Sequence, residues 1–268
     1  MDSNAAGDEP VTGETILETR NLGKRFGYFA ANSGINVRIA AGELRAVIGP
    51  NGAGKTTFFN TIAGTIEASE GEIVFKGQPI TRLDGPARVG LGIAKAFQTA
   101  NIYPDQTVHQ NVRLAALARI QGPFALNVFA RSTRLAAVDT IADEALAAVD
   151  LEAAGARRAG DLSHGDKKRL DIALALATQP HVLLLDEPVA GMSLEESHKM
   201  ERLIRALAGR ITVVIIEHDM DLIMGISDAI TVLHQGRVIA DGTPAQIRAN
   251  AIVQEAYLGG HVDEEIGG

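Results

Sequence analysis

The chain has 268 residues, of which 46% are hydrophobic and 22% are charged, so a folded protein with a sizeable core is expected and a mostly disordered one is excluded. Its 33 acidic and 25 basic residues give a net charge of −8, which argues against nucleic acid as the main partner. The absence of cysteine excludes disulfides, thiolate metal sites and cysteine nucleophiles, and favours a reducing compartment such as the cytoplasm.

The two ends of the chain read as tails. Residues 1–15 are acidic and rich in small side chains, without the basic start and apolar run of a signal peptide. We expect a flexible tail there, a folded domain over residues 16–260 and a second tail over residues 261–268. The longest strand-like apolar runs, Val182–Leu185 and Ile211–Ile216, are much shorter than a membrane helix, so any membrane role should be peripheral.

The first predicted elements are strands. The stretches Ile16–Ile39 and Gly71–Ile80 are typical of antiparallel strands joined by turns. Between them, Leu44–Ile48 leads into a glycine-rich turn and then a helix from about Lys55, as a buried parallel strand would.

The middle of the chain is predicted to be helical. Residues 101–160 contain no strand-like run, but several apolar side chains share one helical face: Val138, Ile141, Ala145, Leu146 and Val149. We therefore expect a helical subdomain inserted at about residues 100–165. Pro123 and Gly122 should break it into pieces.

Strands and helices alternate again after this insertion. The runs Val182–Leu185 and Ile211–Ile216 flank a helical pattern formed by Met200, Leu203, Ile204 and Leu207. Alternation of this kind predicts right-handed βαβ units. The expected fold class is therefore α/β, with a mostly parallel core sheet, an antiparallel β-subdomain and an inserted α-helical subdomain.

The strongest chemical signal is the segment Gly49–Thr57, which matches the phosphate-loop pattern G-x-x-x-x-G-K-[ST]. A chance glycine-rich turn is the alternative, but a predicted strand precedes this segment and a predicted helix follows it, as the mechanism requires. Lys55 should reach the β- and γ-phosphates, and the Thr56 hydroxyl should bind Mg²⁺. The predicted nucleotide-binding residues here are Asn51, Gly52, Ala53, Gly54, Lys55, Thr56 and Thr57.

A second signal is the pair Asp186 and Glu187, which follows the apolar run Val182–Leu185. Acids at the carboxyl end of a parallel strand lie in the crevice where ligands bind. Asp186 is predicted to hold Mg²⁺, and Glu187 to orient or deprotonate the attacking water. The alternative is a solvated strand end, which the nearby phosphate loop makes less favourable.

Two weaker signals are Gln98 and the stretch Leu162–Asp166, which reads Leu-Ser-His-Gly-Asp. Taken alone, neither indicates a function: Gln98 would be a solvated amide, and Leu162–Asp166 would be a helix start capped by Ser163. In this order with the phosphate motifs, the chain resembles the ATP-binding subunits of ATP-binding-cassette (ABC) transporters from about residue 17 to residue 258. The matching motifs are Phe26 with Gly27, Gly49–Thr57, Gln98, Leu162–Asp166, Asp186 with Glu187, Ala190–Ser193, and His218.

The resemblance implies a P-loop NTPase fold that uses ATP and Mg²⁺. Two such subunits would pair head to tail, so that Ser163 and Gly165 meet the γ-phosphate bound by the other subunit. Phe26 would stack on adenine, and His218 would contact the γ-phosphate and the attacking water. Gln98 would take both a catalytic and a metal-binding role.

This chain departs from the family pattern in its signature stretch and in the following loop. His164 replaces the usual first glycine and Asp166 the usual glutamine, whereas the contact residues Ser163 and Gly165 are kept. Ser193 stands where an aspartate is usual, which could weaken communication between the two ATP sites.

Short stretches of the sequence, such as Asp186–Met192 and Ile216–Met220, resemble those of branched-chain amino acid importers. Importers of urea and short amides, lipid or lipopolysaccharide exporters, and soluble ABC ATPases of DNA repair or translation are the alternatives. The importer reading implies transmembrane permeases, indirectly a periplasmic or extracellular solute-binding protein, and a place on the inner face of the cell membrane.

Overall fold

The computed structural model describes residues 13–96, 102–121 and 131–256 of the chain. Ten strands lie within these residues: β1 Thr15–Phe26, β2 Phe29–Ala40, β3 Leu44–Ile48, β4 Glu70–Phe75, β5 Gln78–Pro79, β6 Ile93–Ala96, β7 Val182–Asp186, β8 Thr212–Ile216, β9 Ala229–His234 and β10 Arg237–Gly242. The α-helices include α1 Lys55–Ala63, α2 Gly85–Leu91, α3 Val108–Gln121, α4 Arg131–Ala148, α5 His164–Leu176, α6 Leu194–Ala208, α7 Met220–Ile226 and α8 Pro244–Ala249. Residues 251–256 are also helical. In the described residues, no helix combines the length and the apolar character needed to cross a bilayer.

The strands form two sheets. The larger has the order β10-β9-β3-β8-β7-β6, in which every pair is parallel except β10 with β9. The smaller sheet, β2-β1-β4-β5, is antiparallel. The predicted fold class, with its parallel core sheet and antiparallel β-subdomain, is confirmed.

The two faces of the larger sheet are covered by different layers. Along β7, Leu183 and Leu185 face one hydrophobic cluster, which the helices α3 to α7 complete, while Leu184 faces the other. This second cluster lies between the larger sheet, α1 and the antiparallel sheet, and Phe58 and Phe59 are at its centre. Because both faces are buried, β7 is apolar along most of its length rather than alternating.

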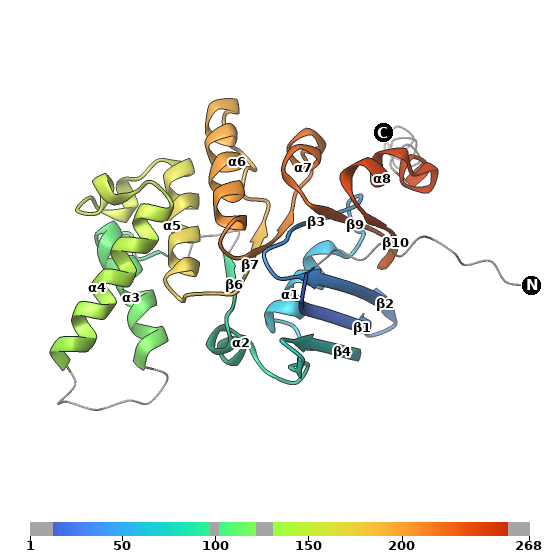
Figure 1. Cartoon of the computed structure of the whole chain (residues 1–268), viewed down its shortest axis with the longest axis horizontal. Coiled ribbons are helices and arrows are strands. Elements are labelled where there is room, and N and C mark those ends of the chain that lie inside the picture. The colour runs from blue at the N-terminus through green and yellow to red at the C-terminus, as the bar shows by residue number, and fades with distance from the viewer. Residues whose placement is uncertain (1–12, 97–101, 122–130, 257–268) are drawn as a thin grey trace, which may run out of the picture.

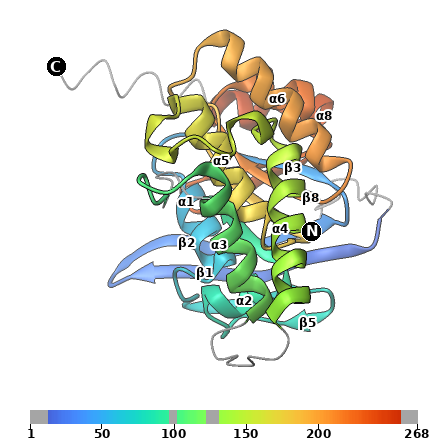
Figure 2. The same ribbon diagram turned by 90° about the vertical axis from the view of Figure 1, so that its left-hand side faces the viewer.

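The predicted helical insertion is present between β6 and β7. Helices α3 and α4 pack side by side at one end of the molecule, next to α5, and Figures 1 and 2 show this end from two directions. Four of the five side chains predicted to share an apolar face are buried, and Ile141 is partly buried. The predicted break at Gly122 and Pro123 lies outside the described residues.

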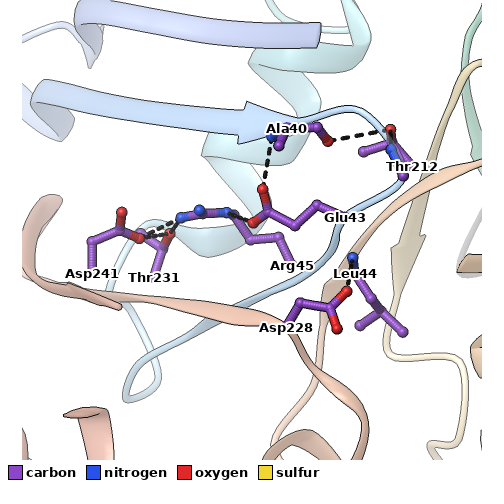
Figure 3. A network of polar contacts seen from close by, with 9 residues as sticks. Ala40, Glu43, Leu44, Arg45, Thr212, Asp228, Thr231 and Asp241 are labelled. Atoms are coloured by element: carbon purple, nitrogen blue, oxygen red, sulfur yellow. Dashed lines mark hydrogen bonds and ion pairs between the residues drawn. The ribbon is translucent and has the colours of Figure 1, made fainter. Parts of the chain in front are cut away.

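A charged network lies inside the fold, between β3 and the β9–β10 hairpin (Figure 3). The guanidinium of Arg45, on β3, pairs with Glu43 at 2.5 Å and also with Asp241 of β10. The side chains of Arg45 and Glu43 are only 2% and 1% exposed. Thr231 of β9 accepts a bond from Arg45 at 2.9 Å and donates one to Asp241 at 2.6 Å. The strand that enters the phosphate loop is thus bonded to the C-terminal hairpin.

We expect Arg45→Met to lower the free energy of unfolding by about 3–5 kcal/mol, because it leaves Glu43 charged, buried and without its partner. Urea unfolding of the purified chain measures this change. The control is Arg38→Met: the Arg38 side chain is 73% exposed beside Glu18, so its loss should change the unfolding free energy by about 1 kcal/mol or less. Equal effects of the two substitutions would contradict a structural role for the buried network.

Candidate functional site

The candidate site lies at the carboxyl ends of three neighbouring strands. Ile216, the last residue of β8, is in register with Val47 of β3 on one side and with Asp186 of β7 on the other. The residues that follow these strands therefore emerge at one edge of the sheet, which is where ligands bind in open α/β folds. They are the phosphate loop after β3, Glu187 after β7, and Glu217 and His218 after β8.

The phosphate loop is shaped by glycines that no larger residue could replace without strain. Gly54, the N-cap of α1, has φ 95°, and a Cβ atom there would lie 2.4 Å from the carbonyl oxygen of Ala31. Gly49 has φ 149°, and a Cβ atom there would lie 2.1 Å from the carbonyl oxygen of Leu233. The loop is thus packed closely against β2 and β9, and its backbone is held in one conformation.

The start of helix α1 can accept an anion. No side chain caps it, and no acidic residue lies in its first turn. The first N–H groups of a helix lack partners within the helix, and its dipole adds positive potential there. Thr56 and Thr57 lie in this first turn, and Thr56 is exposed. Asn51 and Gly52 are also exposed in the preceding turn, whereas Ala53 is buried.

Lys55 is buried and holds the loop closed on itself. Its ammonium donates to the carbonyl oxygens of Gly49 at 2.6 Å and Pro50 at 3.0 Å. Burial lowers the pKa of Lys55, and the charges of Glu187 and Asp186 partly oppose that shift. The charges of both acids thus act on the Lys55 ammonium.

Asp186 has one satisfied and one unsatisfied oxygen. Its Oδ2 accepts a hydrogen bond of 3.1 Å from Lys95, whose ammonium also donates to Asn60 at 2.8 Å. Its Oδ1 is buried and has no hydrogen-bond partner in the described structure. A buried carboxylate oxygen without a partner is unfavourable unless a cation or a donor occupies the site, so Asp186 fits a metal-binding role.

Glu187 and His218 lie face to face. The Nε2 atom of His218 is 2.8 Å from Oε1 of Glu187, so the structure brings these two predicted site residues together. The turn that carries Glu187 has left-handed backbone geometry, with φ 51°. Its amide donates to the carbonyl oxygen of Ile216 at 2.9 Å, which fixes the carboxylate beside the end of β8.

Glu217 joins the two loops that carry these residues, a role that the sequence analysis did not assign. It is 4% exposed, and its carboxylate accepts bonds from the amides of Val189 at 2.9 Å and His218 at 3.0 Å. Asn32 was also missed: its Nδ2 donates to the carbonyl oxygen of Gly54 at 3.1 Å. Glu217 could have been singled out, since it is an acid placed directly after a buried strand.

The remaining predicted residues make other contacts. Ser163 caps α5 by accepting a bond from the amide of Asp166 at 3.1 Å, and Gly165 is buried beside Glu196 of α6. Phe26 is half-exposed at the end of β1, with Lys24 over its ring. The described residues show no hydrogen bond between any of these side chains and the phosphate loop. Gln98 lies outside the described residues.

The acidic residue in the altered signature stretch has a basic partner. Asp166, which stands where the family usually has glutamine, forms an ion pair with Arg169 one turn later in α5. Arg169 also donates to the carbonyl oxygens of Val149 and Asp150, each at 3.3 Å. The extra negative charge is therefore matched by a cation within the same helix.

Comparison with known proteins places this site in a family. A model described as "ABC transporter" matches residues 32–190, and one described as "Branched-chain amino acid ATP-binding cassette transporter" matches residues 237–263. The high-affinity branched-chain amino acid transport ATP-binding protein BraF of Pseudomonas aeruginosa is 39% identical, over 91% of this chain and 98% of that protein. Its counterpart LivG of Escherichia coli is 37% identical, over 92% and 98%.

Solved structures agree with these relatives. An ABC transporter cassette in its ADP conformation has a TM-score of 0.78 and 29% identity, over 92% of this chain and 99% of that one. A dimeric cassette bound to ADP and Pi after hydrolysis has a TM-score of 0.71 and 26% identity, over 85% and 99%. The chain therefore belongs to the ABC transporter family, as one of its ATP-binding ATPase subunits.

Proposed function

We propose that this chain hydrolyses ATP to power a membrane importer of branched-chain amino acids. The observation that carries the proposal is the similarity to BraF and LivG, which extends over 98% of each of those proteins. The match of residues 237–263 to a branched-chain amino acid transporter model adds an independent segment. These relatives favour the branched-chain class over urea or short-amide importers, exporters and soluble ABC ATPases.

In this proposal the nucleotide is bound mainly by residues 49–57 and Phe26. Lys55 leaves the carbonyl oxygens of Gly49 and Pro50 to pair with the β- and γ-phosphates, and the loop amides bind the phosphate oxygens. Glu187 accepts a proton from the attacking water, with His218 beside it to orient both. Gln98 is proposed to act at the same place and to couple hydrolysis to the helical subdomain.

Magnesium fits this site because of the donors present. The hydroxyl of Thr56 is exposed at the start of α1, and the Oδ1 atom of Asp186 is buried without a partner. Oxygen donors of this kind suit Mg²⁺, which usually keeps several waters and is bound through one or two protein groups. A bound Mg²⁺ ion would neutralise charge on the phosphate oxygens.

We expect Asp186→Asn to raise the Mg²⁺ concentration that gives half-maximal hydrolysis by about tenfold or more, because the substitution removes the charge that attracts the cation. Binding of ATP measured without Mg²⁺ should be unchanged. Phosphate release titrated with MgCl₂ at fixed ATP measures the effect, and Asp139→Asn, on an exposed face of α4, is the matched control. An unchanged Mg²⁺ dependence would remove Asp186 from the metal site.

The proposed assembly is a head-to-tail pair of ATP-binding subunits on transmembrane permeases, at the inner face of the cell membrane. The partner is a second copy or a paralogous subunit, and a solute-binding protein delivers the substrate on the other side. The dimeric state of a related cassette supports the pairing. In such a pair, Ser163 and Gly165 of one subunit would complete the phosphate site of the other.

Transport assays test the proposal directly. The chain is reconstituted in liposomes with the permeases and the binding protein that co-purify with it, and uptake of labelled leucine, isoleucine and valine is followed together with phosphate release. ATP-dependent uptake of these amino acids supports the proposal. ATP-dependent uptake of urea or acetamide, with no uptake of leucine, would assign the chain to the amide importers instead. Co-purification with ribosomes or DNA in place of permeases would contradict both.

A further inference from the structure

Lys168 makes contacts that the proposed mechanism does not use. It lies on α5, five residues after Ser163, and its side chain reaches the loop that follows β7. The ammonium donates to the carbonyl oxygen of Glu187 at 3.0 Å and to that of Ala190 at 2.7 Å. Lys168 also lines a small cavity of about 30 Å³ together with Asp186 and Glu187.

Lys168 contacts the backbone of Glu187, and the conformation of this backbone sets the direction of the catalytic carboxylate. Glu187 has φ 51°, a conformation that residues other than glycine rarely adopt and that the surrounding structure must hold in place. Its amide donates to the carbonyl oxygen of Ile216, and its carbonyl oxygen accepts bonds from Lys168 at 3.0 Å and from the amide of Ala190 at 3.3 Å. Lys168 thus makes the shorter of the two bonds to this carbonyl oxygen, and we expect its loss to shift the carboxylate relative to His218.

We propose that Lys168 is a positioning residue, which ties the signature helix α5 to the backbone of Glu187 and so sets the direction of the catalytic carboxylate. The inference rests on the proposed role of Glu187 in hydrolysis. It adds a route between the two ATP sites of the pair: the start of α5 meets the phosphate held by the other subunit, and Lys168 on the same helix holds Glu187 of its own subunit. Because a helix is rigid, a displacement of the start of α5 should also displace Lys168.

Lys168→Met tests this role, since it keeps the length of the side chain but removes the ammonium. With the partner subunit and permeases present, we expect kcat for ATP hydrolysis to fall about 10- to 100-fold, as expected for a misplaced catalytic group. The KM for ATP and the melting temperature should stay close to those of the wild type. Lys168→Arg keeps donors within reach of the same carbonyl oxygens and should recover most of kcat. Lys199→Met on α6, which removes an exposed lysine paired with Glu195, should change none of these quantities.

The possible outcomes separate this inference from the proposed function. Full kcat in Lys168→Met, with normal hydrolysis by the wild type, would overturn the positioning role and leave the proposed function intact. Loss of ATP binding and of the melting transition together, with no recovery in Lys168→Arg, would show a general packing role and would also overturn it. If the wild-type complex itself does not hydrolyse ATP, the proposed function fails, and the positioning role, which rests on it, fails with it.

Discussion

Lys55→Ala is expected to reduce ATP hydrolysis to background, a loss of about 100-fold or more, because it removes the buried cation that we propose pairs with the β- and γ-phosphates. The fold should survive, since the carbonyl oxygens of Gly49 and Pro50 that lose this donor belong to a loop open to water at Asn51 and Gly52. Phosphate release at saturating ATP and a thermal melting profile of the same sample measure both quantities.

The matched control for this experiment is Lys199→Ala, an exposed lysine on α6 whose pairing with Glu195 is worth little in water. It should leave both hydrolysis and melting unchanged. Hydrolysis retained by a natively folded Lys55→Ala variant would remove residues 49–57 from the catalytic site. Loss of the melting transition would show instead that Lys55 is needed for folding.

Glu187→Gln is expected to separate binding from turnover. The amide keeps the size of the side chain and its contact with His218, but it cannot accept a proton from water, so kcat should fall about 10²- to 10⁴-fold. ATP binding should persist. If hydrolysis reopens the paired subunits, as the proposed assembly implies, ATP-bound dimers should accumulate when the correct partner is present, and light scattering after gel filtration detects them.

Glu195→Gln is the control for the loss of a carboxylate, because Glu195 is an exposed residue near the start of α6. It should neither slow hydrolysis nor trap a dimer. If the Glu187→Gln variant shows no ATP-dependent association even with its partner and permeases, two subunits do not share the ATP site as proposed.

The parts of the site that could be predicted from the sequence are local ones. The phosphate loop could be recognised because its strand, turn and helix are continuous over Leu44–Ala63. The two acids at the end of β7, Asp186 in the strand and Glu187 directly after it, could be recognised because they follow the apolar run Val182–Leu185. In both cases, residues close together in the sequence define the motif, so the sequence alone is sufficient to predict it.

The parts that could not be predicted depend on which elements pack together. Lys168 and Glu187 are 19 residues apart, Asn32 and Gly54 22, and Glu217 and Val189 28. No periodicity relates these pairs, because their contacts follow from how α5, β2 and β8 pack in the tertiary structure. Arg45 shows the same limit: it interrupts the apolar run Leu44–Ile48, and its burial is explained by Glu43 together with Thr231 on β9 and Asp241 on β10. The last two partners could not be predicted from the sequence.

The β9–β10 hairpin limits how far the chain can be shortened at its C-terminal end and still keep a supported nucleotide site. The turn residue Gly236 donates to the carbonyl oxygen of Ala53, in the phosphate loop, at 3.0 Å, and accepts a bond from Ser33 at 2.8 Å. Its neighbour β10 supplies Asp241 to Arg45. A fragment cut after residue 190 keeps both acids and the loop, but it loses these supports along with strand β8. The residues that support the nucleotide site therefore come from distant parts of the sequence. A shortened version of the subunit must keep the hairpin through Gly242.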